Sequence, residues 1–97
     1  MKRLRDFWEK HPNAERPMRR WYKVTSKANW HDLNRTRTTF AHADPVQVDS
    51  GTTMTVFNVG GNNYRIVARV LYDYGRVYIK TVLTHVEYDR GRWKEQL

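Results

Sequence analysis

The chain has 97 residues, no cysteine and a formal net charge of +8 at pH 7. A chain of this length forms one domain, residues 1–97, with a modest core. The lack of cysteine excludes disulfides and thiolate metal sites and favours a reducing cytoplasm. No apolar run approaches the ~20 residues of a membrane span and the N-terminus does not resemble a signal peptide, so we expect a soluble cytoplasmic protein that uses no membrane.

The basic residues are interleaved with aromatic ones, which make up 13% of the chain. Lysine and arginine displace counterions from phosphates, and aromatic rings stack on unpaired bases. This combination favours a nucleic-acid-binding protein. Basic proteins also bind acidic partners or anionic membranes, so the charge by itself leaves these classes open.

The first third of the chain predicts two helices that form an antiparallel pair. Leu4, Phe7, Trp8 and His11 have the spacing of an amphipathic helix, and Pro12 ends it. Asn13 is the expected N-cap of the second helix, whose apolar positions then recur at helical spacing. We expect three aromatic residues of this pair to pack on a sheet: Phe7, Trp8 and Trp21. Three basic residues lie off that face and form a solvated flank or follow an RNA backbone: Arg19, Arg20 and Lys23.

The segment from residue 30 to residue 53 has weaker patterns. Residues 32–37 predict a short helix or an ordered loop, and residues 43–45 predict a turn. Residues 46–49 alternate like a brief edge strand, and a turn at residues 49–51 joins this strand to the central hairpins. His31 and His42 lack the partner spacing of a metal site, so we interpret them as surface histidines.

Residues 55–83 predict three antiparallel strands joined by two tight turns. Glycine and asparagine at residues 60–63 are the residues that hairpins with positive φ demand, and this loop pairs Phe57 with Ile66 and Asn58 with Arg65. A second turn at residues 73–75 pairs Val70 with Val77 and Ala68 with Ile79. One sheet face is then apolar, and the other is basic and aromatic. The residues of that second face are Asn58, Arg65, Arg69, Tyr78 and Lys80.

A short helix is predicted after the third strand. Thr84 and Glu87 have the spacing of a capping box, in which hydroxyl and carboxylate satisfy helix-start amides reciprocally. His85 and Tyr88 are three residues apart and therefore lie on one side of this helix.

Several of these segments carry a resemblance to a known family. The strings VFNVGG-N-YR, VYIK and THVEYD, with DFWEKHP-AE-P-R-WY and AD-V before them, resemble the HigB-type toxins. These are a branch of the RelE-like superfamily of messenger-RNA endonucleases in bacterial toxin–antitoxin systems. Members of the family usually begin with a short strand before the first helix. This chain passes almost directly into LRDFWEK, so either the sheet lacks that edge strand or the natural start lies upstream.

The resemblance implies an α+β, RelE-like fold, with two N-terminal helices packed on a small antiparallel β-sheet and a short C-terminal helix. It also implies cleavage of mRNA, on the ribosome during translation, and no cofactor or metal. A cognate HigA-type antitoxin would neutralise the toxin and, together with it, repress their shared promoter. Contact with operator DNA would then occur only through the antitoxin.

The polar sheet face supplies candidates for this chemistry. RNA is cut without metal when its 2′-hydroxyl attacks the adjacent phosphate, which needs a base, cations for the phosphate and an acid. Arg65 would bind the phosphate, Lys80 would stabilise charge or move a proton, and His85 would take or give a proton. Tyr88 would orient the phosphate or stack on a base. The expected further RNA contacts are Asn58, Arg69 and Tyr78.

Three of these residues also have a structural interpretation. Arg65 can lie in water along its strand, His85 can bond to backbone at the helix start, and Tyr88 can pack into the sheet. The turn at residues 60–63 lacks P-loop spacing and implies no nucleotide cofactor. The alternative functions are a non-catalytic RNA- or ribosome-binding module and a degenerate toxin that only binds its antitoxin. A DNA-binding regulator is a weaker alternative, because neither N-terminal helix resembles a recognition helix.

Overall fold

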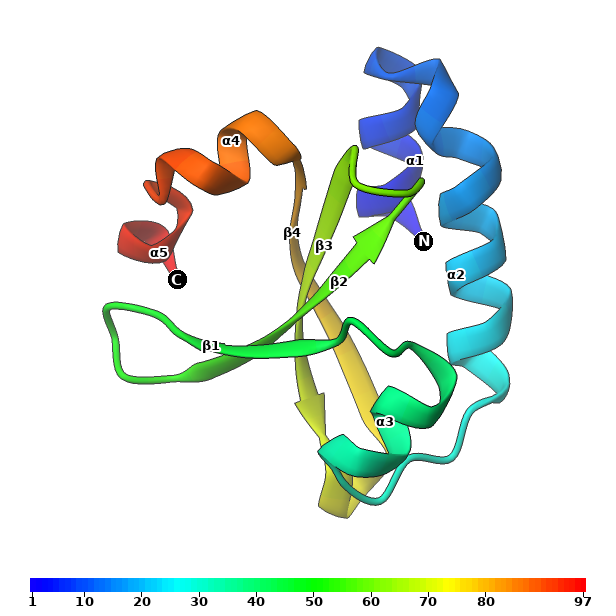
Figure 1. Ribbon diagram of the computed structural model, residues 1–97, viewed down its shortest axis with the longest axis vertical. Helices are drawn as coiled ribbons and strands as arrows, with labels where there is room; N and C mark the ends of the chain where they lie inside the picture. The colour runs from blue at the N-terminus through cyan, green and yellow to red at the C-terminus, as the bar shows by residue number, and fades with distance from the viewer.

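The computed structural model describes all residues, 1–97 (Figure 1). Helices and strands separate along the chain: helices come first, the strands follow as a block, and two short helices end the chain. The helices are α1 (Lys2–Lys10), α2 (Glu15–Lys27), α3 (Leu33–Thr39), α4 (His85–Arg90) and α5 (Trp93–Gln96). The strands are β1 (Asp44–Gln47), β2 (Thr53–Val59), β3 (Tyr64–Leu71) and β4 (Arg76–Thr84). The predicted α+β class is confirmed.

The strands form one antiparallel sheet in the order β1-β2-β3-β4. Its register is the predicted one at both hairpins, since Phe57 pairs with Ile66 and Val70 pairs with Val77. A β-bulge interrupts the β3–β4 ladder between Val67 and Ala68. No strand precedes α1 in this structure, so β4 is an outer strand of the sheet.

The two N-terminal helices pack on one face of the sheet, as predicted. Phe57 of β2 is fully buried, and its ring lies 5.3 Å from that of Trp21 and 6.0 Å from that of Trp30 between centroids. Leu4 and Trp8 bring α1 into the same core, and Phe7 packs at its margin. The aromatic residues of the helix pair are therefore core residues, because burying these large apolar rings is the main gain of docking the helices.

The opposite face of the sheet is not the wholly basic and aromatic surface that we expected. It carries a second, smaller apolar core made of Val48, Met54, Val56, Val67 and Trp93. The α4–α5 unit covers this part of the sheet (Figure 1), and α5 itself was not predicted. Alternation places Val56 and Val67 on this face, where they need an apolar cover that only the folded C-terminus supplies.

Two local predictions need correction. Asp44 and Pro45 belong to β1, and the turn lies one step earlier at Ala41 and His42. Proline is accommodated there because β1 is an edge strand. Asn13 does not cap α2. It lies inside a 3₁₀ turn (Pro12–Ala14), and no side chain caps the helix.

Two other helix starts have side-chain caps. The uncertain segment after Trp30 forms α3, and the Asp32 side chain accepts a hydrogen bond from the Arg35 backbone N–H at 2.9 Å. The capping box of α4 is confirmed. Glu87 N donates to Thr84 Oγ1 at 3.2 Å, and Thr84 N donates to Glu87 Oε1 at 2.9 Å. None of the helices combines the length and apolar character needed to cross a bilayer.

The β2–β3 turn offers a matched pair of glycine substitutions. Gly60 and Gly61 both have positive φ, at 65° and 67°. A Cβ at Gly61 meets open space, whereas one at Gly60 would lie 3.0 Å from the ring of Tyr64. We expect Gly61→Ala to cost about 1–2 kcal/mol of unfolding free energy from backbone strain. Gly60→Ala should cost a further ~1–3 kcal/mol from overpacking. Urea unfolding of both variants measures the difference, and equal losses would show that Tyr64 moves aside freely.

Candidate functional site

A groove opens where the β2–β3 hairpin, α4 and the α3–β1 connection meet. We call it the Arg65 groove, with a volume of about 610 Å³. Its walls are mainly polar and come from segments far apart in the chain. The lining residues are Arg37, Ala41, His42, Ala43, Asp44, Val56, Asn58, Arg65 and Tyr88. Asn58, Arg65 and Tyr88 are thus brought together, and the register explains part of this because Asn58 and Arg65 are cross-strand partners.

The Arg65 guanidinium is held in place by the hairpin that carries it. It donates to the carbonyl oxygens of Asn62 and Tyr64 and to the Asn62 side-chain oxygen, each at 3.1 Å. Its central carbon lies 5.4 Å from the centroid of the Tyr88 ring, a cation–π arrangement. All three acceptors are neutral, so the hydrogen bonds fix the position of the cation without cancelling its charge. Such a group is preorganised to bind an anion.

Tyr88 is half-buried and supported from behind by α5. Its ring stacks on Trp93 at 5.3 Å between centroids, and Trp93 Nε1 donates to the Tyr88 carbonyl oxygen at 3.1 Å. Burial raises the pKa of the Tyr88 phenol, with a further increase from the Asp44 carboxylate, against a lowering by Arg65. The phenol is therefore protonated at neutral pH and available as a hydrogen-bond donor.

The third wall of the groove was missed by the sequence analysis. Arg37 Nε donates to the Ala43 carbonyl oxygen at 2.9 Å, and Arg37 Nη2 lies 3.9 Å from Asp44 Oδ1. This ion pair is exposed, so it contributes little stability and leaves both groups accessible to a ligand. Extending the predicted edge strand by two residues would have revealed Asp44, which pairs with Val56 of β2. No pattern in the sequence marks Arg37 or His42 as neighbours of Arg65.

Four predicted site residues do not line the Arg65 groove. Arg69 and Tyr78 are cross-strand partners and exposed, but Arg69 is four positions from Arg65, about 13 Å along β3. Lys80 is half-buried and lies at the β-bulge. Thr81 pairs with Val67 and Ile79 pairs with Ala68, so Lys80 is the extra residue between these two pairs.

His85 is the fourth of these residues. It is exposed at the start of α4, and its backbone N–H donates to the Asn63 carbonyl oxygen at 2.9 Å. This bond ties α4 to the β2–β3 hairpin and so helps to place Tyr88 beside Arg65. The structure gives the His85 side chain no partner.

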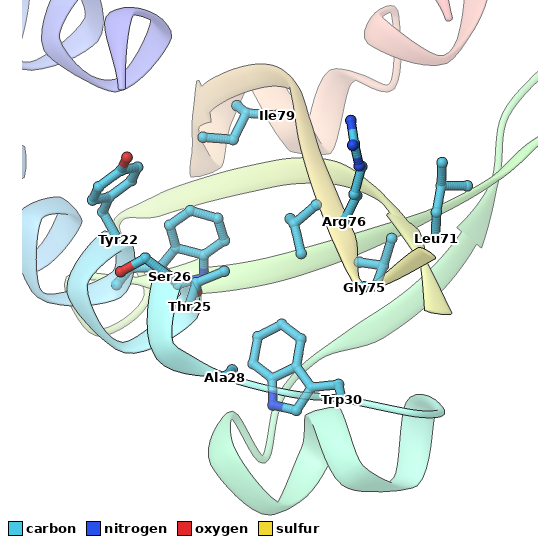
Figure 2. A pocket seen from close by; sticks show the side chains of 12 residues that line it. Tyr22, Thr25, Ser26, Ala28, Trp30, Leu71, Gly75, Arg76 and Ile79 are labelled. Carbon is cyan, nitrogen blue, oxygen red and sulfur yellow. The ribbon is translucent and has the colours of Figure 1, made fainter. Parts of the chain in front are cut away.

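A different hollow lies on the helix side of the sheet (Figure 2). Tyr22, Thr25 and Ser26 come from α2 on one side, and Arg76 and Ile79 come from β4 on the other. Most of its lining is apolar, with Arg76 as the one charged residue. None of the predicted site residues takes part, and its chemistry does not match a phosphate-rich ligand.

The titration of Tyr88 gives a direct test of the groove's electrostatics. We expect its phenol to ionise above the ordinary value of about 10, because burial outweighs the lowering by Arg65. Since the folded pKa is raised, the stabilising effect of the neutral phenol is complete below the ordinary pKa and is lost as pH rises through the folded pKa.

Phenolate absorbance and unfolding free energy, followed against pH for wild type and Tyr88→Phe, measure this effect. Tyr74→Phe, at a residue that is 76% exposed, is the control. Ionisation of Tyr88 at or below the ordinary value would show that the Arg65 charge dominates.

The fold and groove together define a small α+β protein with a preorganised arginine beside a protonated tyrosine on a sheet. The family model for the HigB toxin, described as the RelE-like toxic component of a toxin-antitoxin system, matches residues 14–91. The chain therefore belongs to this family.

Two relatives illustrate the likeness. The chain is 56% identical over 34 residues to the mRNA interferase toxin HigB of Escherichia coli (strain K12), a match covering 35% of this chain and 33% of that protein. It is 28% identical over 81 residues to the mRNA interferase HigB of Escherichia coli O6:H1, covering 84% of this chain and 77% of the relative. The match thus spans only about a third of the length of the K12 relative.

Proposed function

We propose that this protein is a metal-independent endoribonuclease that cuts mRNA on the translating ribosome, in the cytoplasm, and so inhibits translation. The family match and the relatives' name, mRNA interferase, support an RNA substrate. The observation that carries the proposal is the Arg65 groove, where a guanidinium fixed by neutral acceptors lies over the ring of a protonated tyrosine. In this proposal a HigA-type antitoxin neutralises the protein and brings it to operator DNA.

The proposed reaction is an internal transfer. The substrate's 2′-oxygen bonds to the adjacent phosphorus, the bond from phosphorus to the 5′-oxygen breaks, and a cyclic phosphate and a 5′-hydroxyl result. Arg65 holds the scissile phosphate and stabilises its growing negative charge. Asn58 orients the phosphate or sugar, and Tyr88 donates a proton to the departing oxygen.

The proton acceptor in this proposal is a histidine. His85 begins α4, three residues before Tyr88, and His42 lines the groove itself. The imidazole nitrogen of either one can accept the 2′ proton as a general base. Lys80 of β4 supplies further positive charge beside the substrate, while Arg69 and Tyr78 contact RNA beyond the scissile bond.

Primer extension on a defined mRNA tests the proposal, with protein stripped by EDTA and desalted, and with or without translating ribosomes in Mg²⁺ buffer. We expect discrete cuts that need ribosomes and that form at the same rate with stripped and untreated protein. His42→Ala and His85→Ala, assayed in parallel, identify the proton acceptor by which variant loses cleavage. If RNA is bound but remains whole under all these conditions, the non-catalytic binding module is the correct function.

A further inference from the structure

A second groove lies between α2 and the β2–β3 hairpin, and we call it the α2 groove. It has a volume of about 810 Å³ and no acidic residue in its lining. Arg16 and Arg20, one helical turn apart, supply its charge. Its remaining lining residues are Pro17, Trp21, Val24, Thr39, Phe40, Asn58, Val59, Gly60 and Gly61.

Neither arginine of the α2 groove has an ion-pair partner. The two salt bridges of the structure join Arg19 to Glu15 and Arg37 to Asp44. Arg16 and Arg20 are both exposed, so their guanidinium groups are free to bind an anionic ligand. Arg19, between them in sequence, is instead engaged by Glu15 at 2.7 Å and lies over the ring of Trp8.

The α2 groove and the Arg65 groove share Asn58, which lines both. The β1 strand pairs with β2 only along residues 53–56, so β1 does not cover the β2 edge at Asn58. The hairpin itself stands between α2 and α4 (Figure 1). On one side a Cβ at Gly60 would lie 3.4 Å from Pro17, and on the other Asn63 accepts the bond from His85. A ligand can therefore pass from Arg20 over Asn58 to Arg65, because β1 is not paired with β2 at that point.

We infer that this path is a track for single-stranded RNA, in which Arg16 and Arg20 bind phosphates next to the one held by Arg65. The inference rests on the proposed function and extends the substrate site beyond the scissile bond. Arginine forks match phosphate geometry, and consecutive phosphates are the ligand that needs separate cations along a path. An acidic protein segment fits less well, because its charged side chains would face the half-buried apolar residues Val24 and Phe40, whereas the bases of single-stranded RNA offer planar apolar surface to them.

The test is binding of a 2′-O-methyl RNA dodecamer, which cannot be cleaved, measured by fluorescence anisotropy at several salt concentrations. Arg16→Ala/Arg20→Ala should bind at least about tenfold more weakly at low salt, with the slope of log K against log salt reduced by about 1.4 for two phosphate contacts. Arg19→Ala/Lys23→Ala removes the same charge from the same helix outside the groove. This control should stay within about threefold of wild type.

Two further measurements separate the alternatives. On cleavable mRNA the Arg16/Arg20 variant should have a raised KM and a nearly unchanged kcat, because the scissile phosphate stays with Arg65. If the control variant loses RNA binding equally, the effect comes from the general positive charge of α2, and the proposed track is wrong. If RNA binding is unchanged while binding of poly-L-glutamate is lost, the groove belongs to an acidic polypeptide instead. Absence of cleavage by wild type would refute the proposed function alone, since the binding comparison does not depend on catalysis.

Discussion

Replacing Arg65 with alanine is expected to slow mRNA cleavage by about 10²–10³-fold, the usual cost of removing one preorganised transition-state donor. The guanidinium is held by three hydrogen bonds to neutral acceptors and lies over Tyr88, so its charge and position are set before substrate binds. The other arginine of the groove, Arg37, donates to the Ala43 carbonyl oxygen and pairs with the Asp44 carboxylate, which offsets part of its charge. Single-turnover cleavage by purified variants measures the effect.

Two matched variants sharpen this prediction. Arg65→Lys keeps the charge but loses the planar fork and its bonds to Asn62, so we expect it to recover only part of the rate. Arg92→Ala, at an exposed residue between α4 and α5, removes the same charge outside the groove and should cleave like wild type. Full activity of Arg65→Ala, with the protein folded, would place the chemistry elsewhere.

Replacing Trp93 with alanine is expected to lower the free energy of unfolding by about 3–5 kcal/mol, the range for truncating a buried tryptophan. Trp93 is 5% exposed and packs with Val48, Met54, Val56 and Val67 in the second core. Its ring also supports Tyr88, and its indole N–H binds the Tyr88 carbonyl oxygen. A catalytic effect should therefore accompany the loss of stability, because Tyr88 loses its support beside Arg65.

The two effects can be separated. Urea unfolding gives the stability change, and cleavage measured at low temperature and corrected for the folded fraction gives the effect on the site. Trp93→Phe keeps a ring on which Tyr88 can stack. We expect its unfolding free energy and its cleavage rate to lie between those of Trp93→Ala and wild type. Gln96→Ala, at an exposed residue of α5, should change stability by no more than about 0.5 kcal/mol. An unchanged urea midpoint for Trp93→Ala would mean that the packing of α5 does not stabilise the sheet.

Much of the fold could be predicted because its signals are local. The glycines of the β2–β3 turn and the alternation on either side set the pairing of Phe57 with Ile66, since a one-residue slip would expose the whole apolar set. Thr84 and Glu87 mark the start of α4 through bonds made within a single turn. Helical spacing identified the aromatic residues that α1 and α2 bury.

The sequence by itself thus determined the strand register, the helix that carries Tyr88 and the pairing of Asn58 with Arg65. Only the tertiary structure decided which side chains meet in the Arg65 groove. The α3–β1 connection brings Arg37, His42 and Asp44 to it, while the bulge beside Val67 and the helix start leave Lys80 and His85 outside its lining. The physical reason is that local patterns specify which face of a strand a side chain occupies. Its neighbours across the groove depend on how distant segments cover that face, here through the burial of Val56 and Val67 under Trp93.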